Sequence, residues 1–269
     1  MQTRPFGTTQ RQVPVIGQGT WYGPGDRRDA AIAALRRGIE LGMTHIDTAE
    51  MYLNGTAEEW VREAVGTQRD QVFLVSKVLP HNASRKGTLQ ACERSLRRLG
   101  TDHLDCYLLH WPGDHPLRET VAAFEQLKAE GKILAWGVSN FDAPELDGLA
   151  PACNQVLYHL GERAIEHAVS PWCERHGAAL VAYSTFGHGD FPRNSVLQSI
   201  ADETRATPRQ VALAFLMRAP HTFAIPKTTH LEYVAENAAA ADVQLTREQM
   251  ERIDQAFPLG RKPRYLPML

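Results

Sequence analysis

The chain has 269 residues, close to the roughly 250 residues of a single (β/α)8 barrel. Hydrophobic residues make up 43% of it and charged residues 22%, which is ordinary for a globular protein. The formal net charge of −2 gives no electrostatic reason to expect a nucleic acid as partner, and we expect none.

The spacing of the cysteines and the hydropathy of the chain predict the cellular compartment of the protein. The cysteines, at positions 92, 106, 153 and 173, show neither CxxC nor CxxH spacing, so we expect no metal site and no redox dithiol. No apolar run approaches the roughly 18 residues of a membrane span, and the first residues lack the apolar segment of a signal peptide. We therefore expect reduced thiols, no membrane partner and a cytoplasmic location.

Strand-like and helix-like segments alternate along the chain. A short hairpin is expected first, from Thr3–Phe6 and Gln12–Ile16. The segments predicted as strands are His45–Asp47, Val72–Lys77, Leu104–His110, Leu134–Ser139, Gln155–Tyr158, Ala179–Tyr183 and Phe223–Ile225. The amphipathic segments predicted as helices are Arg28–Leu41, Thr56–Val65, Ser84–Leu99, Pro116–Glu130, Pro144–Leu149, Ala164–His176 and Pro208–Arg218.

This regular order predicts the fold class. Strands that alternate with helices are typical of a parallel sheet. We expect α/β architecture, a (β/α)8 TIM barrel in one domain over residues 1–269, with the N-terminal β-hairpin closing the bottom of the barrel. Seven strands are visible before the final helices, so the eighth strand must be too weak to recognise.

Four residues able to hold or move a proton follow or end three successive predicted strands: Asp47, Tyr52, Lys77 and His110. Each alone is more often structural, but chemistry in a barrel gathers at the C-terminal ends of its strands. A free tyrosine has a pKa of about 10, and a nearby ammonium lowers it. We therefore expect Tyr52 to be a general acid whose pKa is lowered by Lys77, with Asp47 holding Lys77 and His110 orienting a substrate oxygen.

A series of short sequence motifs resembles those of a known protein family. The strings are GQGTWYG (17–23), HIDTAEMY (45–52), LVSK (74–77), LLHWP (108–112), GVSNF (137–141), NQVLYH (154–159), AYSTFG (182–187) and IPKTTHLEYVAEN (225–237). From about residue 3 to residue 257 the chain resembles the aldo-keto reductases. The resemblance implies a barrel that reduces a carbonyl with NADPH and without metal. The family's catalytic residues fall on Asp47, Tyr52, Lys77 and His110, with Tyr52 protonating the oxygen.

The resemblance also implies where a cofactor binds. The matching positions are Thr20 in the site wall; Ser139, Asn140 and Gln155 at the carboxamide; Tyr183 stacked on the nicotinamide; Ser184, Phe186, Gly187 and Gly189 at the pyrophosphate; Lys227 and Thr228 at the 2′-phosphate; and Tyr233 and Asn237 near the adenine. Trp21 and Trp111 are the expected walls of the substrate pocket.

One position departs from the family pattern. Tyr233 stands where many members have an arginine that contacts the 2′-phosphate and adenine, and a tyrosine cannot make the charged fork of an arginine. Because Lys227 remains, NADPH is still the expected cofactor. We expect a weaker preference over NADH than is usual, so NADH is possible.

Two other functions stay open from the sequence. One is an NADPH-binding sensor or regulatory subunit with little turnover, as in the potassium-channel β-subunits that resemble this family. The other is an aldolase that uses Lys77 as a Schiff base. The tail after Phe257 has the sequence PLGRKPRYLPML, and so short a tail predicts a cavity open at the top for small aldehydes or ketones. We expect a monomer.

Overall fold

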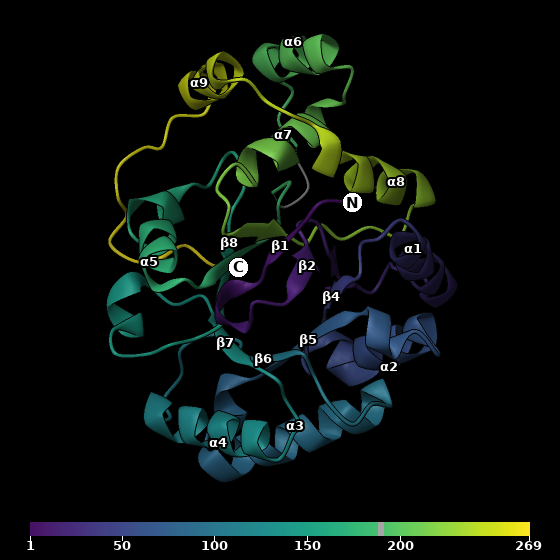
Figure 1. Cartoon of the computed structure of the whole chain (residues 1–269), viewed down its shortest axis with the longest axis vertical. Helices are drawn as coiled ribbons and strands as arrows, with labels where there is room; N and C mark the ends of the chain where they lie inside the picture. Colours follow the sequence, from purple (N-terminus) through teal and green to yellow (C-terminus); the bar gives the residue numbers. More distant parts are fainter. Residues whose placement is uncertain (188–190) are drawn as a thin grey trace.

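Within the described residues, eight parallel strands form one sheet at the centre of the molecule (Figure 1). The structure is a computed structural model, and it describes residues 1–187 and 191–269. Neighbouring strands follow one another in chain order. The strands are β3 Gln18–Gly19, β4 His45–Asp47, β5 Phe73–Val78, β6 Cys106–Leu109, β7 Trp136–Ser139, β8 Cys153–Leu157, β9 Ala179–Tyr183 and β10 Thr222–Ala224.

The sheet closes on itself where the chain before β3 meets β10. Ile16 forms a parallel bridge with Ala224, and the Gly17 N–H donates to the Ala224 carbonyl at 2.8 Å. A Cβ at Gly19 would come within 2.8 Å of the Ile225 carbonyl oxygen, so this close approach requires glycine. The barrel predicted from the sequence is confirmed. The strand that was too weak to recognise is β3, which has two residues.

The α-helices surround the barrel (Figure 1). They are α1 Arg28–Glu40, α2 Thr56–Val65, α3 Arg85–Leu99, α4 Leu117–Ala129, α5 Val169–His176, α6 Ser195–Thr204, α7 Pro208–Leu216, α8 Leu231–Ala239 and α9 Arg247–Ala256. Their apolar stripes cover the outward side chains of the strands: Val61 of α2 and Leu96 of α3 share a buried cluster with Leu74 of β5.

Two predicted helices differ from the structure. The helix expected at Pro144–Leu149 is a single 3-10 turn, Ala143–Leu146, because Asp142 and Glu145 form a capping box around one turn and the chain then leaves helical geometry at Asp147. The helix expected at Ala164–His176 is divided at Ala168, where φ is −146°, into a 3-10 turn and α5. Neither difference moves a strand end.

The N-terminal hairpin closes the bottom of the barrel, as predicted. Strands β1 (Thr3–Pro5) and β2 (Gln12–Pro14) pair antiparallel and lie across one end of the barrel (Figure 1). The buried Phe6 ring lies 4.6 Å from the ring of Phe73 and 5.0 Å from that of Phe223, at the N-terminal parts of β5 and β10. This end is plugged by aromatic packing, which leaves the other end for chemistry.

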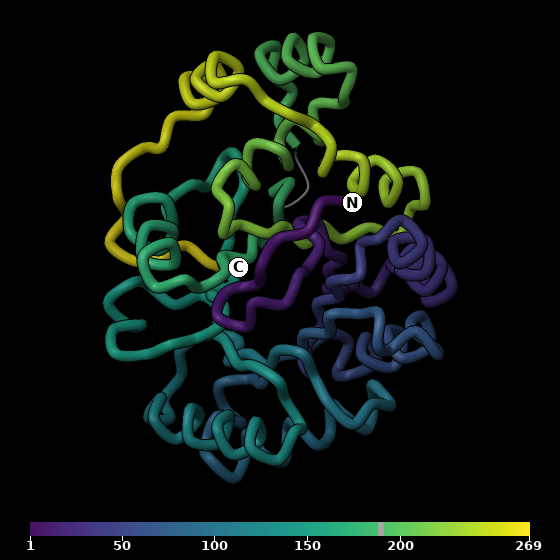
Figure 2. The backbone as a smooth tube through the Cα atoms, viewed as in Figure 1, coloured from purple at the N-terminus to yellow at the C-terminus, as the bar shows by residue number. Residues whose placement is uncertain are grey.

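The C-terminal tail returns to the barrel after α9. In Figure 2 it runs along one side of the molecule and ends near its middle. Leu266 packs against the main buried cluster, and the Leu269 N–H donates to the Tyr183 hydroxyl at 3.3 Å. The last residue of the chain therefore lies at the C-terminal end of β9.

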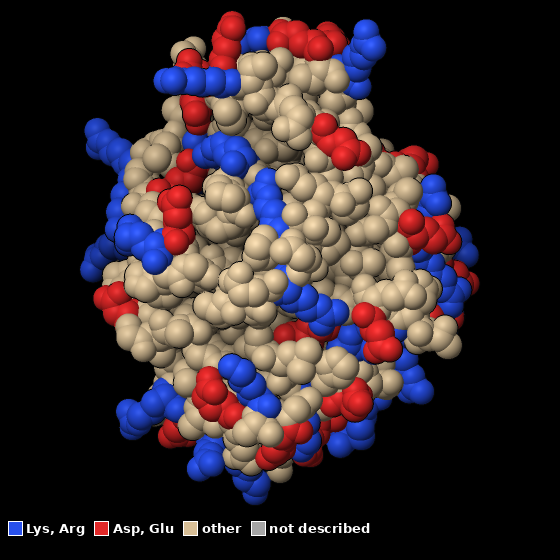
Figure 3. All heavy atoms as spheres, in the orientation of Figure 1, with Lys and Arg blue, Asp and Glu red and all other residues tan. Residues whose placement is uncertain are grey.

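Charges of both signs are spread over the surface. On the face shown in Figure 3, lysine and arginine side chains are mixed with aspartate and glutamate around the rim, and neither sign dominates. Among the described residues, every helix is too short or too polar to cross a membrane.

We predict that Phe6→Ala lowers the free energy of unfolding by about 3–5 kcal/mol, because it opens a cavity among the rings at the bottom of the barrel. Urea denaturation measures the change. Leu134→Ala, at a side chain that is 49% exposed, is the control and should stay within about 0.5 kcal/mol of the parent protein. Equal effects of the two substitutions would contradict the role assigned to the hairpin.

Candidate active site

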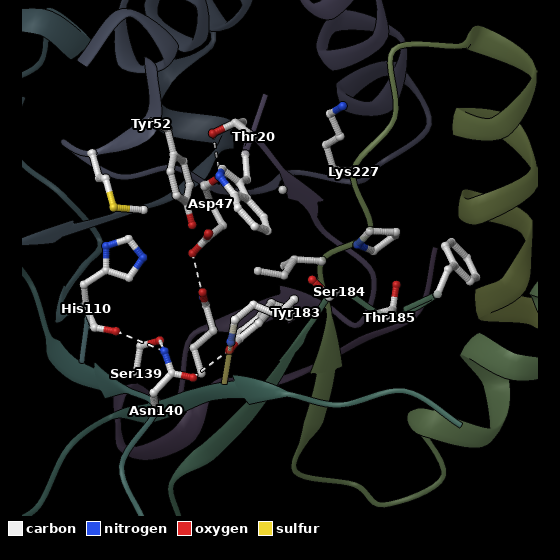
Figure 4. A pocket seen from close by; sticks show the side chains of 18 of the residues that line it. Thr20, Asp47, Tyr52, His110, Ser139, Asn140, Tyr183, Ser184, Thr185 and Lys227 are labelled. Atoms are coloured by element: carbon white, nitrogen blue, oxygen red, sulfur yellow. Dashed lines mark hydrogen bonds between the residues drawn. The ribbon is translucent and has the colours of Figure 1, made fainter. Parts of the chain in front are cut away.

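A cavity of about 520 Å³ lies at the C-terminal ends of the strands (Figure 4). Alternation along each strand explains its polar floor. In β5, Phe73, Val75 and Lys77 share one face, and the first two belong to the cluster that fills the barrel. The same alternation brings Asp47 to the end of β4 and places His110 directly after β6. The residue pattern thus gives an apolar barrel interior capped by a polar layer.

Three of the four predicted proton-handling side chains bond to one another. The Lys77 ammonium donates to Asp47 Oδ1 at 2.5 Å and to the Tyr52 hydroxyl oxygen at 3.1 Å. It also donates to the Thr48 carbonyl at 2.8 Å, so all its donors have acceptors. On the other side of the carboxylate, Gln155 Nε2 donates to Asp47 Oδ2 at 2.7 Å. Side chains from β4, β5 and β8 therefore hold the Lys77–Asp47 pair in place.

A strained turn places Tyr52 over the end of β4. Tyr52 begins a 3-10 turn, Tyr52–Gly55, in which Leu53 and Asn54 adopt left-handed backbone angles with φ of 49° and 54°. Such angles are unfavourable for residues other than glycine. Helix α2 starts directly afterwards at Thr56, and its packing against the barrel holds the turn in place.

Burial changes the ionisation of this cluster. Burial would lower the pKa of Lys77, but Asp47 and Tyr52 outweigh it and leave that pKa raised. Burial raises the pKa of Tyr52, and the opposing effect of Lys77 is too small to reverse the shift. The expected lowering of the Tyr52 pKa is therefore wrong, because the sequence shows the neighbouring charge and not the loss of solvent. Tyr52 is held in its protonated form.

His110 faces the Tyr52 ring with its imidazole neutral. Burial holds the pKa of His110 well below its ordinary value, and the charge of Lys77 adds to the effect. The two rings meet edge to face at 5.6 Å. The His110 side chain lines the cavity beside Tyr52, so part of its ring is accessible to a ligand.

A second group of side chains lies between β9 and the cluster of Asp47, Tyr52 and Lys77. Asn140 has a left-handed φ of 63°, and its amide nitrogen donates to the His110 carbonyl and the Ser139 hydroxyl, both at 3.2 Å. The Tyr183 hydroxyl donates to Asn140 Oδ1 at 2.8 Å. Ser139, Asn140, Gln155 and Tyr183 all line the cavity. They present a fixed set of amide and hydroxyl groups beside Tyr52.

The cavity extends away from this cluster towards Lys227. Figure 4 shows Lys227, Ser184 and Thr185 on one side and Tyr52 and His110 on the other. Lys227 Nζ is paired with Asp26 at 2.5 Å. Phe186 and Gly187 also line this part, and Gly189 lies outside the described residues.

Several predicted residues do not line the cavity. Lys77 has no exposed surface and lies beneath the floor, so it cannot form a Schiff base with a ligand there without breaking its ion pair. Thr228 and Asn237 line a separate small pocket with Gln18, and Tyr233 is 42% exposed on α8. Thr20, Trp21 and Trp111 do line the cavity.

Sequence reasoning missed part of the lining. The additional residues are Gly19, Met51, Thr185, Ile225, Pro226 and Leu269. Most of them adjoin predicted residues in the chain, which was a usable signal. Leu269 gave none: the tail reaches the cavity despite its length. In the described residues no cluster of His, Cys, Asp or Glu could hold a metal ion.

Comparisons with known proteins agree with this geometry. The sequence model of the Aldo/keto reductase family matches residues 15–257. The chain is 45% identical to the methylglyoxal reductase YeaE of Escherichia coli strain K12, over 96% of this chain and 95% of that protein. It is 34% identical to a glyoxal reductase of Bacillus subtilis strain 168, over 87% of each. A solved aldo-keto reductase from Klebsiella pneumoniae in complex with NADPH has a TM-score of 0.92 and 45% identity, covering 100% of this chain and 99% of that one.

We predict that Lys77→Met lowers the free energy of unfolding by about 3–5 kcal/mol, because it leaves the buried Asp47 charge unpaired. Lys77→Met combined with Asp47→Asn removes both charges and should recover most of that loss. Urea denaturation at neutral pH measures both variants. The control is Arg247→Met, which breaks an exposed pair with Glu251. An equally small loss of unfolding free energy in Lys77→Met and in Arg247→Met would contradict the structural role of the buried pair.

Proposed function

Because the chain belongs to the aldo/keto reductase family, we propose that it reduces small aldehydes and ketones to alcohols with NADPH. The resemblance seen in the sequence is thereby confirmed at the level of the family. The observation that best supports the reaction is the contact of the Tyr52 hydroxyl with the Lys77 ammonium at 3.1 Å, above the Lys77–Asp47 pair. A protonated phenol beside a fixed positive charge can give up its proton to a developing alkoxide.

When bound, NADPH would supply the hydride that the carbonyl carbon accepts. Tyr52 donates its proton to the carbonyl oxygen, and the Lys77 ammonium stabilises the phenolate that remains. Asp47 keeps Lys77 charged and in place. The product alcohol thus gains one hydrogen with its electron pair at carbon and one proton at oxygen, and solvent entering the cavity returns the proton to Tyr52.

His110 is proposed to orient the substrate oxygen. Its neutral imidazole is packed against the Trp111 ring at 4.8 Å as well as against Tyr52, so its position is fixed from two sides. A neutral ring can donate one hydrogen bond without competing with Tyr52 as an acid. The place of His110 in the cavity lining, beside the Tyr52 ring, is the observation that supports this role.

We propose that the nicotinamide end of NADPH lies in the cavity beside Tyr52. The Asn140 and Gln155 amides and the Ser139 hydroxyl would hold the carboxamide, and Tyr183 would stack on the nicotinamide. Beyond them, the buried Thr185 hydroxyl has no hydrogen-bond partner among the described residues, and the Lys227 ammonium, paired with Asp26, lines the cavity.

The remaining assignments continue past Lys227 to the small pocket that Thr228 and Asn237 line. We propose Ser184, Phe186, Gly187 and Gly189 for the pyrophosphate, Lys227 and Thr228 for the 2′-phosphate, Asn237 for an adenine contact and Thr20 for the wall beside Asp47. Thr20 donates to the Asp47 carbonyl at 2.9 Å, which supports that last position.

Small dicarbonyl compounds are the proposed substrates. Relatives are named as reductases of methylglyoxal and glyoxal, and here Trp21, Trp111, Met51 and Leu269 line the cavity together with Tyr52.

We also propose a cytoplasmic monomer, since all four cysteines are unpaired and buried and one chain supplies the described cavity. Sedimentation equilibrium at the mass of two chains would contradict the monomer.

We predict that Tyr52→Phe lowers kcat for methylglyoxal by about 10²–10⁴-fold, because the general acid is lost. The Kd for NADPH should change by about twofold or less, since the phenol contributes to the chemical step. Steady-state NADPH oxidation and fluorescence titration measure the two quantities. Tyr265→Phe, at a side chain that is 71% exposed, is the matched control and should behave as the parent protein.

Other outcomes of these measurements would favour a function that the sequence leaves open, or would contradict the proposed one. Tight NADPH binding without turnover on any of a panel of aldehydes would favour a sensor. Survival of activity in Tyr52→Phe would contradict general acid catalysis by Tyr52.

A further inference from the structure

Arg209 lies among three aromatic rings at the start of α7. The guanidinium carbon is 5.1 Å from the centre of the Phe186 ring, 5.2 Å from that of Phe191 and 5.6 Å from that of Tyr233. These separations are those of cation–π contacts, which hold a guanidinium flat on a ring while its N–H groups stay available at the edge. The rings therefore fix the position of the charge.

The charge of Arg209 has no carboxylate beside it among the described residues. Two other arginines that contact an aromatic ring, that of Phe215, are paired: Arg218 donates to Glu166 at 2.7 Å, and Arg163 is paired with both Glu166 and Asp254. Arg209 shows no such partner in the described part of the chain, and no hydrogen bond uses its five N–H donors there. A fixed and uncompensated guanidinium is suited to an anionic ligand.

The backbone around Arg209 is tied to α8. The Thr207 hydroxyl donates to Glu236 at 2.5 Å, and Gln210 Nε2 donates to the Glu236 carbonyl at 2.9 Å. Helix α8 also carries Tyr233, so these hydrogen bonds join the start of α7 to the helix that carries the Tyr233 ring. The cage of Phe186, Phe191 and Tyr233 is thus built into the fold.

The cage adjoins the proposed cofactor site. Phe186 lines the main cavity together with Gly187 and Lys227. Tyr233 occupies the position at which the family resemblance leads one to expect an arginine for the 2′-phosphate and adenine. The chain therefore lacks a guanidinium at position 233 and holds one against the ring of that same residue.

We propose that Arg209 replaces the missing arginine: its guanidinium binds the 2′-phosphate of the adenosine end of NADPH, and Tyr233 positions it. This inference rests on the proposed function, because it assumes that NADPH occupies the cavity. The selectivity for NADPH over NADH then depends on Arg209 together with Lys227, and the departure at Tyr233 does not by itself weaken it.

Binding titrations test the proposal without using turnover. Tryptophan fluorescence gives the Kd of the parent protein and of Arg209→Ala for NADPH and for NADH, and calorimetry gives the Kd for adenosine 2′,5′-bisphosphate and adenosine 5′-monophosphate. We expect Arg209→Ala to weaken NADPH and the bisphosphate by about tenfold to hundredfold, the effect of a lost charge-assisted contact. The Kd for NADH and the monophosphate should change by about threefold or less, since neither carries a 2′-phosphate.

Two further variants separate the role in binding from a role in packing. Arg247→Ala, at an exposed arginine of α9, is the control and should leave every Kd unchanged. In Arg209→Ala with Tyr233→Arg, a guanidinium returns at position 233, and we expect most of the NADPH affinity to return. The proposal would be overturned if Arg209→Ala weakened the binding of NADPH and of NADH equally, or if it weakened neither. It would also be overturned if the double variant recovered no affinity for NADPH.

The parent protein distinguishes failure of this inference from failure of the proposed function. If the parent binds NADPH tightly and Arg209→Ala binds it equally well, only the role of Arg209 is wrong. If the parent binds neither NADPH nor the bisphosphate, the proposed function is wrong as well, and Arg209 has no cofactor role.

Discussion

The ion pair between Lys77 and Asp47 is the constraint on which the rest of the site depends. Both groups are buried, Asp47 in the floor of the cavity and Lys77 beneath it, where an unpaired charge would be very costly. The pair is tolerated because β4, β5 and β8 bring Asp47, Lys77 and Gln155 together at one end of a closed barrel, and because the Thr48 carbonyl takes another donor of the ammonium. Barrel closure and the alternation of side chains are therefore conditions for the chemistry as much as for the fold.

The same constraint explains the division of the barrel into two ends. At the N-terminal end, Phe6 and its neighbours fill the interior with aromatic rings. At the opposite end, polar side chains replace them and leave a cavity. Tyr52 belongs to a strained turn outside the strands. Its phenol therefore lies over the Lys77–Asp47 pair without being part of a strand. The cavity continues from this point to Lys227, and the proposed cofactor follows that course, with Arg209 at its far end.

Much of this arrangement could be predicted from the sequence. Strands β4 and β9 have the predicted bounds, because apolar alternation and flanking turns mark them clearly. Asp47, Tyr52, Lys77 and His110 could be selected because each stands at or just after a strand end. The direction of the Tyr52 pKa could not be predicted, since it depends on how much solvent the fold removes. Leu269 and Arg209 also escaped prediction, because their contacts join segments that are distant in the chain and carry no local periodicity.

The ionisation of Tyr52 gives the most direct test of the central claim, that a buried charge pair stabilises a tyrosine that keeps its proton until the carbonyl oxygen needs it. Carbon-13 labelling of the tyrosine ring carbons that bear oxygen allows each phenol to be titrated by NMR, and Tyr52→Phe identifies the resonance. Since burial raises the pKa of Tyr52, its resonance should not shift below about pH 10. A titration of Tyr52 near neutral pH would contradict a protonated acid at rest.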